Sequence, residues 1–225
     1  MTPPTETTTP QSVRLEIAGI TLNGDLSPTA GAHGLIVFAH GSGSSRHSPR
    51  NRAVAEVLQH ARLATLLLDL LTEPEDAGDA RTAEFRFDIP LLADRVVAAI
   101  DWAAAQPSTS SLPVGLFGAS TGAAAALIAA AQRPAAVRAV VSRGGRPDLA
   151  DASLEAVVAP TLLIVGGLDE TVIRLNRLAF ERLKAAKELQ IVPGATHLFE
   201  EPGALERVSQ LARDWFLQHL IPLSS

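Results

Sequence analysis

The feature of this sequence that most constrains its fold is a short apolar run that turns through a serine directly into an alanine-rich segment. Val114–Phe117 is followed by G-A-S-T-G and then by residues of high helix propensity up to Ala131. A serine at such a strand-to-helix corner projects its oxygen above the sheet, and the flanking glycines let neighbouring backbone pass without a Cβ clash. The following helix points its N-terminal amides at the same space. Ser120 is therefore the first candidate for a nucleophile.

The motif alone leaves a second interpretation open, because G-x-S-x-G fixes only three residue types. The alternative is a dinucleotide-binding turn built on Gly115, Gly118 and Gly122. Their spacing is not G-x-G-x-x-G, and no ribose-binding acid stands at the end of the next strand. The rest of the chain has to decide between a catalytic serine and a structural glycine corner.

Strand and helix patterns alternate along the chain after an antiparallel start. Alternation of apolar and polar residues predicts a pair of edge strands at 13–17 and 20–26. Continuous apolar runs predict buried strands at 34–39, 64–69, 114–117, 137–141, 161–165 and 189–192, and helical spacing predicts helices at 49–61, 89–105, 172–183 and 204–220. Between them, an acidic segment with Glu73, Glu75, Asp76 and Asp79 is expected to be irregular. This order predicts the α/β class: a mostly parallel, doubly wound sheet with antiparallel N-terminal edge strands and helices on both faces.

Composition limits the remaining classes of function. The 225 residues are 47% hydrophobic, and we expect a disordered tail over residues 1–11 and a single domain over 12–225. No apolar run reaches the roughly 18 residues of a membrane span and the start lacks a secretion signal, so we expect a cytoplasmic protein without a membrane partner. The net charge of −5 argues against a nucleic-acid partner, and the absence of cysteine excludes a thiolate nucleophile and cysteine-based metal sites.

A serine hydroxyl needs a base to accept its proton, and that base must be oriented by a third group. Among the six histidines, His197 leaves the last predicted strand in a short loop and is the candidate base. His40 lies in the H-G-S-G loop, where bracing the backbone is the preferred role. Asp169 in G-G-L-D-E is the candidate orienting acid, with Glu170 as the alternative. Either carboxylate could instead cap the following helix.

Four motifs together carry a resemblance to a known family: G-A-S-T-G, H-G-S-G after an apolar strand, G-G-L-D-E and G-A-T-H. Over roughly residues 13–220 the chain resembles an α/β-hydrolase, and most of all the dienelactone hydrolase family. The resemblance implies Ser120, Asp169 and His197 as nucleophile, acid and base, and the backbone amides of Ser42 and Thr121 as the oxyanion hole. The remaining histidines and carboxylates show no ligand spacing such as H-E-x-x-H, so we expect a site without metal or cofactor. The dienelactone hydrolases that give the family its name have a cysteine nucleophile, whereas this chain has Ser120 at that position. The resemblance therefore does not fix a lactone as the substrate, but acyl transfer is expected with either nucleophile.

The substrate is expected to be a small-molecule ester, lactone or thioester, hydrolysed through an acyl-enzyme by a monomer or homodimer. Only residues 144–160 separate two predicted strands where many hydrolases insert a helical lid, which predicts an open site. Two groups are expected to border the site: Arg46, His47 and Arg50 beside the H-G-S-G loop, and Arg143 and Arg146 after the strand at 137–141. One or more of these arginines, with Arg46 and Arg143 as the first candidates, is expected to bind an anionic group on the substrate. The alternative is that such arginines pair with local carboxylates. Acyl transfer to another acceptor, and a binding module without catalysis, are the alternative functions.

Overall fold

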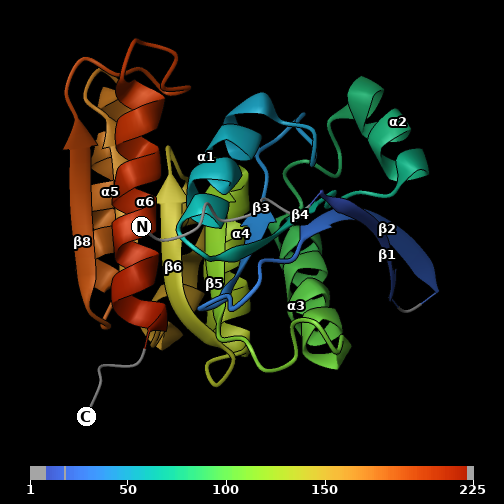
Figure 1. Ribbon diagram of the computed structural model, residues 1–225. Helices are drawn as coiled ribbons and strands as arrows, with labels where there is room; N and C mark the ends of the chain where they lie inside the picture. Colours follow the sequence, from blue (N-terminus) through green and yellow to red (C-terminus); the bar gives the residue numbers. More distant parts are fainter. Residues whose placement is uncertain (1–8, 18, 222–225) are drawn as a thin grey trace.

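The computed structural model describes residues 9–17 and 19–221, and its strands form an eight-stranded sheet with helices on both faces (Figure 1). In the order β1-β2-β4-β3-β5-β6-β7-β8, the strands span Gln11–Ile17 (β1), Ile20–Ser27 (β2), Ala64–Leu68 (β4), Leu35–Ala39 (β3), Val114–Ala119 (β5), Val137–Arg143 (β6), Thr161–Gly166 (β7) and Lys187–Val192 (β8). The helices span Pro49–His60 (α1), Glu73–Thr82 (α2), Ile89–Ala105 (α3), Thr121–Gln132 (α4), Glu170–Arg182 (α5) and Ala204–Leu220 (α6), with a 3-10 segment at Pro147–Ala156 (η1).

The predicted sheet is confirmed, including its antiparallel edge. β1 pairs with β2 and β2 with β4 in antiparallel fashion, while β4, β3, β5, β6, β7 and β8 are parallel neighbours. Most of the tail predicted over residues 1–11 lies outside the described residues, and β1 already begins at Gln11. None of the described helices is long and apolar enough to cross a membrane.

Two apolar cores lie on opposite faces of the sheet, which explains why its central strands read as continuous apolar runs. α3 and α4 pack on one face, and α1 and α6 pack on the other (Figure 1). α4 approaches β5 so closely that a Cβ on Gly118 would collide with the backbone of Ala123. The small side chains of α4 therefore bring its N-terminus directly over the end of β5.

The acidic segment after β4 is a helix, so the prediction of irregular structure there was wrong. Thr72 caps α2 in a capping box, since its side chain accepts from the Glu75 amide and the Glu75 carboxylate accepts from the Thr72 amide. Within α2, Asp79 is the buried residue. With no apolar face, α2 gives no helical periodicity, and only its capping residues signal a helix.

Candidate active site

Ser120 occupies the corner between β5 and α4 in a strained backbone conformation. Its φ of 51° and ψ of −123° lie in a region that residues with a side chain rarely adopt. The corner is held from two sides. The Ser120 amide donates to the carbonyl of Arg143 at 3.3 Å, and a Cβ on Gly41 would lie only 2.9 Å from the Ser120 Cβ. The neighbouring loops therefore fix the position from which the Ser120 hydroxyl projects.

Asp169 and His197 meet above the carboxyl ends of β7 and β8. His197 Nδ1 lies 2.7 Å from Asp169 Oδ2, whereas Asp169 Oδ1 accepts from the Val172 amide at 3.4 Å. The same carboxylate thus orients the imidazole and caps α5, and Glu170 is exposed at the start of that helix. Because an ionised carboxylate only accepts, Nδ1 carries the proton and leaves the Nε2 lone pair free. This is the tautomer that a general base requires.

The loop after β6 brings the imidazole and the hydroxyl to the same corner. Arg143 holds the Ser120 amide through its carbonyl, and a Cβ on the next residue, Gly144, would lie 3.6 Å from His197 Cε1. Within the described residues, no hydrogen bond joins the Ser120 hydroxyl to His197. Such bonds commonly tighten only when substrate binds. The structure therefore places the three sequence-predicted residues around one corner, with the Asp169–His197 contact formed.

The two residues predicted for the oxyanion hole are in direct contact. Ser42 Oγ and Thr121 Oγ1 are 3.0 Å apart, one on the loop after β3 and the other in the first turn of α4. In the described part of the chain, neither backbone amide donates to a protein acceptor. Two free amides beside Ser120 suit the negative charge of a tetrahedral intermediate.

The loop that carries Ser42, which we call the oxyanion loop after its predicted role, is anchored by an ion pair between the buried Asp79 and the partly buried Arg86, which the sequence did not reveal. Ser42 Oγ donates to the Arg86 carbonyl at 3.3 Å. The Asp79 carboxylate, on a residue only 1% exposed, accepts from the amides of Phe85 and Arg86 at 2.8 and 2.9 Å and from Arg86 Nε at 2.6 Å. Desolvation alone would raise the pKa of Asp79. The hydrogen bonds from these donors and the charge of Arg86 together lower it by more, so the pKa of Asp79 lies below its usual value. Asp79 was predicted only as part of an acidic insertion.

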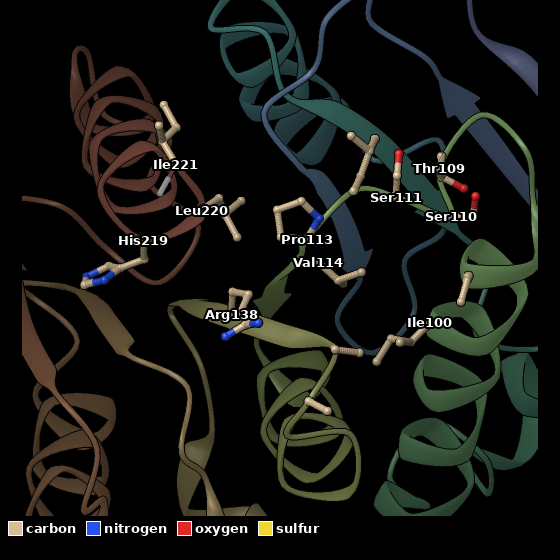
Figure 2. A pocket seen from close by; sticks show the side chains of 14 residues that line it. Ile100, Thr109, Ser110, Ser111, Pro113, Val114, Arg138, His219, Leu220 and Ile221 are labelled. Carbon is tan, nitrogen blue, oxygen red and sulfur yellow. The ribbon is translucent and has the colours of Figure 1, made fainter. Parts of the chain in front are cut away.

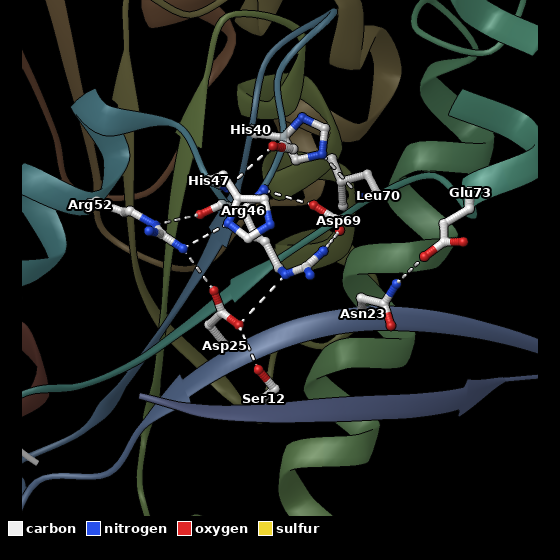
Figure 3. A network of polar contacts seen from close by, with 11 residues as sticks. Ser12, Asn23, Asp25, His40, Arg46, His47, Arg52, Asp69, Leu70 and Glu73 are labelled. Carbon is white, nitrogen blue, oxygen red and sulfur yellow. Dashed lines mark hydrogen bonds and ion pairs between the residues drawn. The ribbon is translucent and has the colours of Figure 1, made fainter. Parts of the chain in front are cut away.

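His40 braces the same loop, as its motif suggested. The ring bonds through Nδ1 to the Gly41 carbonyl at 2.9 Å, and Nε2 accepts from the Leu70 amide at 3.0 Å (Figure 3). Burial lowers the pKa of His40, against the opposing effects of the Gly41 carbonyl and the charges of Asp69 and Asp76. At pH 7 the His40 imidazole is therefore uncharged, and its two hydrogen bonds link the loop after β3 to the loop after β4.

The arginines around the site differ in how their charges are matched. Arg46 pairs with Asp69 and lies 3.5 Å from Asp25, and Arg146 pairs with Asp148 at 2.8 Å (Figure 3 shows the Arg46 network). For Arg46 and Arg146 the structure thus shows the alternative considered from the sequence, in which the arginine pairs with a nearby carboxylate. Arg143 is only 6% exposed, and its side chain has no carboxylate partner among the described residues. Of Arg46 and Arg143, only Arg143 therefore lacks a carboxylate partner in the described part of the chain, and its side chain is buried.

Comparison with known proteins identifies the family. The model of the dienelactone hydrolase family matches residues 54–219, which is most of the chain. The chain belongs to the dienelactone hydrolase family. A dienelactone hydrolase from Anabaena variabilis, known from a crystal structure, is 59% identical with a TM-score of 0.92, and the match covers 94% of this chain and 99% of that one. Est1E from Butyrivibrio proteoclasticus shares the fold at 17% identity and a TM-score of 0.77, over 92% and 98% of the two chains.

Two curated relatives of this dienelactone hydrolase family member come from strains of Mycobacterium tuberculosis. Each is named a putative phosphoribosyl transferase and is 57% identical over 210 residues. The match covers 93% of this chain but only 46% of each relative. The chain therefore spans about half the length of the curated relatives it matches.

A pocket lies at the opposite end of the sheet from Ser120. Its volume is about 600 Å³, and Pro113, Val114, Arg138 and Leu220 are among its lining residues (Figure 2). Ligands of parallel sheets bind beyond the carboxyl ends of the strands, whereas this cavity adjoins the amino ends of β5 and β6. Within residues 9–17 and 19–221, no group of three or more His, Cys, Asp or Glu side chains is placed to hold a metal ion.

Proposed function

We propose that this member of the dienelactone hydrolase family is a serine hydrolase that cleaves a carboxylic ester, lactone or thioester through an acyl-enzyme. The observation that carries the proposal is the 2.7 Å contact between His197 Nδ1 and Asp169 Oδ2, beside the strained Ser120 corner. That contact leaves Nε2 as the free acceptor, which a neutral serine needs to become nucleophilic.

In the proposed reaction, Ser120 Oγ attacks the carbonyl carbon while His197 Nε2 takes the hydroxyl proton. Asp169 remains ionised and stabilises the imidazolium through Nδ1. The imidazolium then gives its proton to the leaving alcohol or thiol, and the carbonyl of the acyl-enzyme re-forms. In the second half, His197 takes a proton from water, the resulting hydroxide attacks the acyl carbon, and Ser120 leaves with the proton.

The proposed oxyanion hole stabilises the charge that develops on the carbonyl oxygen in both halves. The amides of Ser42 and Thr121 supply the two donors, and their side-chain contact at 3.0 Å holds them at a fixed spacing. Losing one such donor typically lowers turnover about 100- to 1,000-fold. The strain at Ser120 is consistent with a corner that is maintained for this chemistry.

The names of the relatives point to two reactions. The family and the Anabaena variabilis structure carry the name dienelactone hydrolase, and the Mycobacterium tuberculosis proteins carry the name phosphoribosyl transferase. The name phosphoribosyl transferase describes the whole Mycobacterium tuberculosis proteins, and the match to this chain covers only 46% of their length. The residues gathered at the Ser120 corner support acyl transfer to water, and we assign that reaction to the matched part.

The proposal is tested by assaying wild-type protein and the Ser120→Ala variant against a panel of p-nitrophenyl esters, lactones and thioesters. We expect the variant to lose the activity of the wild type while it keeps the same circular dichroism spectrum and unfolding temperature. Added alcohols or thiols separate hydrolysis from acyl transfer, because an acyltransferase forms new esters instead of free acid. Activity retained by a folded Ser120→Ala protein, or a wild type inactive on the whole panel, would refute the assignment.

A further inference from the structure

One short segment holds Ser120 from both sides. It consists of the last residue of β6 and the three residues that follow it, 143–146, which we call the β6 loop. The Ser120 amide donates to the Arg143 carbonyl at 3.3 Å, and the Ser120 carbonyl accepts from the Arg146 amide at 3.0 Å. The position of the β6 loop therefore determines where the Ser120 corner lies.

The β6 loop is also packed tightly against its other neighbours. A Cβ on Gly144 would lie 3.0 Å from the carbonyl oxygen of His197 and 3.6 Å from its Cε1. A Cβ on Gly145 would collide with Ser142 Oγ and with the side chain of Ala123, in the first turn of α4. The β6 loop thus lies between the loop of the proposed base and α4, so a displacement of this loop would move the proposed nucleophile relative to the base.

Asn176 connects the β6 loop to the helix that carries the proposed acid. Its side chain is fully buried within α5, and Nδ2 donates to the Gly145 carbonyl at 2.9 Å and to the Val172 carbonyl at 2.8 Å. Asp169 is the N-cap of the same helix, and its carboxylate accepts from the Val172 amide and contacts His197. Through Gly145, Asn176 therefore links the Asp169–His197 pair to the β6 loop.

The oxygen of the same side chain shows that an amide is not the best choice for packing alone. Asn176 Oδ1 is buried and makes no hydrogen bond within the described residues. Burying an unpaired acceptor is costly, and an apolar side chain of similar size, such as leucine, would avoid that cost. We therefore attribute the amide at this position to the two bonds that Nδ2 donates.

We propose that Asn176 is a positioning residue, which holds the β6 loop against α5 and so keeps Ser120 aligned with the proposed base. The inference rests on the proposed hydrolase function, and Asn176 acts in it through the Gly145 carbonyl. Without that bond the β6 loop is free to shift, and the strained Ser120 corner, with its φ of 51°, can relax. Because a misplacement of about 1 Å can lower a rate about 100-fold, turnover should suffer more than substrate binding.

The test uses two variants that remove different hydrogen bonds of Asn176. Asn176→Leu keeps a similar volume and removes both bonds. Asn176→Ser removes the bond to Gly145 but can keep one within α5, because a serine hydroxyl donates to the carbonyl four residues earlier, which here belongs to Val172. We expect both variants to lower kcat on a p-nitrophenyl ester about 10- to 100-fold, with KM nearly unchanged. If Asn176→Leu fails to fold, Asn176→Ser decides alone.

Thr109→Val is the matched control, because it also removes a buried hydrogen bond. Thr109 is 2% exposed, and its hydroxyl donates to the Ala103 carbonyl at 2.7 Å, at the end of α3. Thr109→Val should lower the unfolding temperature as the Asn176 variants do, but it should keep the wild-type kcat. Wild-type kcat in folded Asn176→Leu, a recovery of kcat in Asn176→Ser, or an equal loss in Thr109→Val would overturn the positioning role.

A second readout does not depend on turnover. Amide hydrogen exchange followed by NMR reports on the two bonds between Ser120 and the β6 loop, which the amides of Ser120 and Arg146 donate. Both amides should exchange at least about fivefold faster in the Asn176 variants than in the wild type and in Thr109→Val, as expected for the loss of one hydrogen bond. Equal exchange in all proteins would contradict the role of Asn176. A wild type inactive on every ester refutes the hydrolase function and leaves this measurement unaffected.

Discussion

The two ends of the sheet offer a ligand very different surroundings. At the carboxyl end, loops after β3, β5, β7 and β8 bring together a strained serine, a paired histidine and two amides that bond to no protein acceptor among the described residues. At the amino end lies a pocket of about 600 Å³, with apolar, hydroxyl and arginine side chains in its lining (Figure 2). Within that lining, no serine sits beside an acid and a base. The arrangement of polar groups, and not the size of a pocket, therefore indicates where a reaction is expected.

The largest effect should come from the base and its orienting acid. His197→Ala removes the proton acceptor and should lower kcat about 10,000- to 1,000,000-fold, and Asp169→Asn should lower it about 10,000-fold. Glu170→Gln is the matched control and should leave kcat unchanged, because Glu170 is exposed and the carboxylate that pairs with His197 in the described structure is that of Asp169. Steady-state kinetics on a p-nitrophenyl ester measure all three. Similar losses in Glu170→Gln and Asp169→Asn would contradict the assignment of the acid.

A smaller effect is expected from the anchor of the oxyanion loop. Asp79→Asn weakens the hold on Arg86, whose carbonyl accepts from Ser42, and should lower kcat about tenfold with KM nearly unchanged, less than the loss of a donor. Affinity for a trifluoromethyl ketone, whose adduct carries an oxyanion, should fall in parallel. Asp101→Asn breaks an exposed pair with Arg133 and serves as control. If Asp79→Asn changes stability alone and leaves kcat and ketone affinity intact, Asp79 does not position the oxyanion loop.

His40, at the carboxyl end of the sheet, should make the free energy of unfolding depend on pH. Burial lowers its pKa in the folded protein below the usual value of 6.5, so the unfolded chain binds the proton more tightly. The stabilisation is present above about pH 6.5 and is lost as the pH falls from there through the folded pKa, with a slope of at most about 1.4 kcal/mol per pH unit. Urea unfolding between pH 5 and 8 should show a smaller slope in His40→Asn. An unchanged slope would contradict an uncharged His40 imidazole in the folded protein.

The smallest effect is expected at the amino end. Arg138→Ala and Ser111→Trp alter the exposed side chains of the large cavity, far from the loops that hold Ser120. Both variants should hydrolyse the ester panel with wild-type kcat and KM. A marked loss of kcat in either variant would break the contrast between the two ends of the sheet and would make the cavity part of the reaction.

The order of strands and helices was predictable because each buried strand reads as an apolar run that ends in a polar loop. The same feature located Asp169 and His197, since both follow such runs and parallel strands bring their carboxyl ends to one edge. The edge pair β1 and β2 was predictable from apolar and polar alternation. These signals are local, so a single sequence contains them.

What sequence reasoning missed depends on contacts between distant segments. α2 has no apolar face, and the role of Asp79 becomes visible only when Arg86 and Ser42 are seen together. The partners of the arginines are equally remote, since Arg46 meets Asp69, and Arg143 meets Asn51 across 92 positions in the chain. No periodicity or motif in the sequence distinguishes a paired arginine from an unpaired one.

The central claim is that Ser120 is a nucleophile activated by His197. Its most direct test is to label the folded protein with a fluorophosphonate and to locate the modification by mass spectrometry of peptides. We expect one phosphonylated peptide that contains Ser120, with labelling lost in Ser120→Ala and strongly slowed in His197→Ala. A wild type that stays unlabelled, or a label carried by another serine at the same rate in all three proteins, would contradict it.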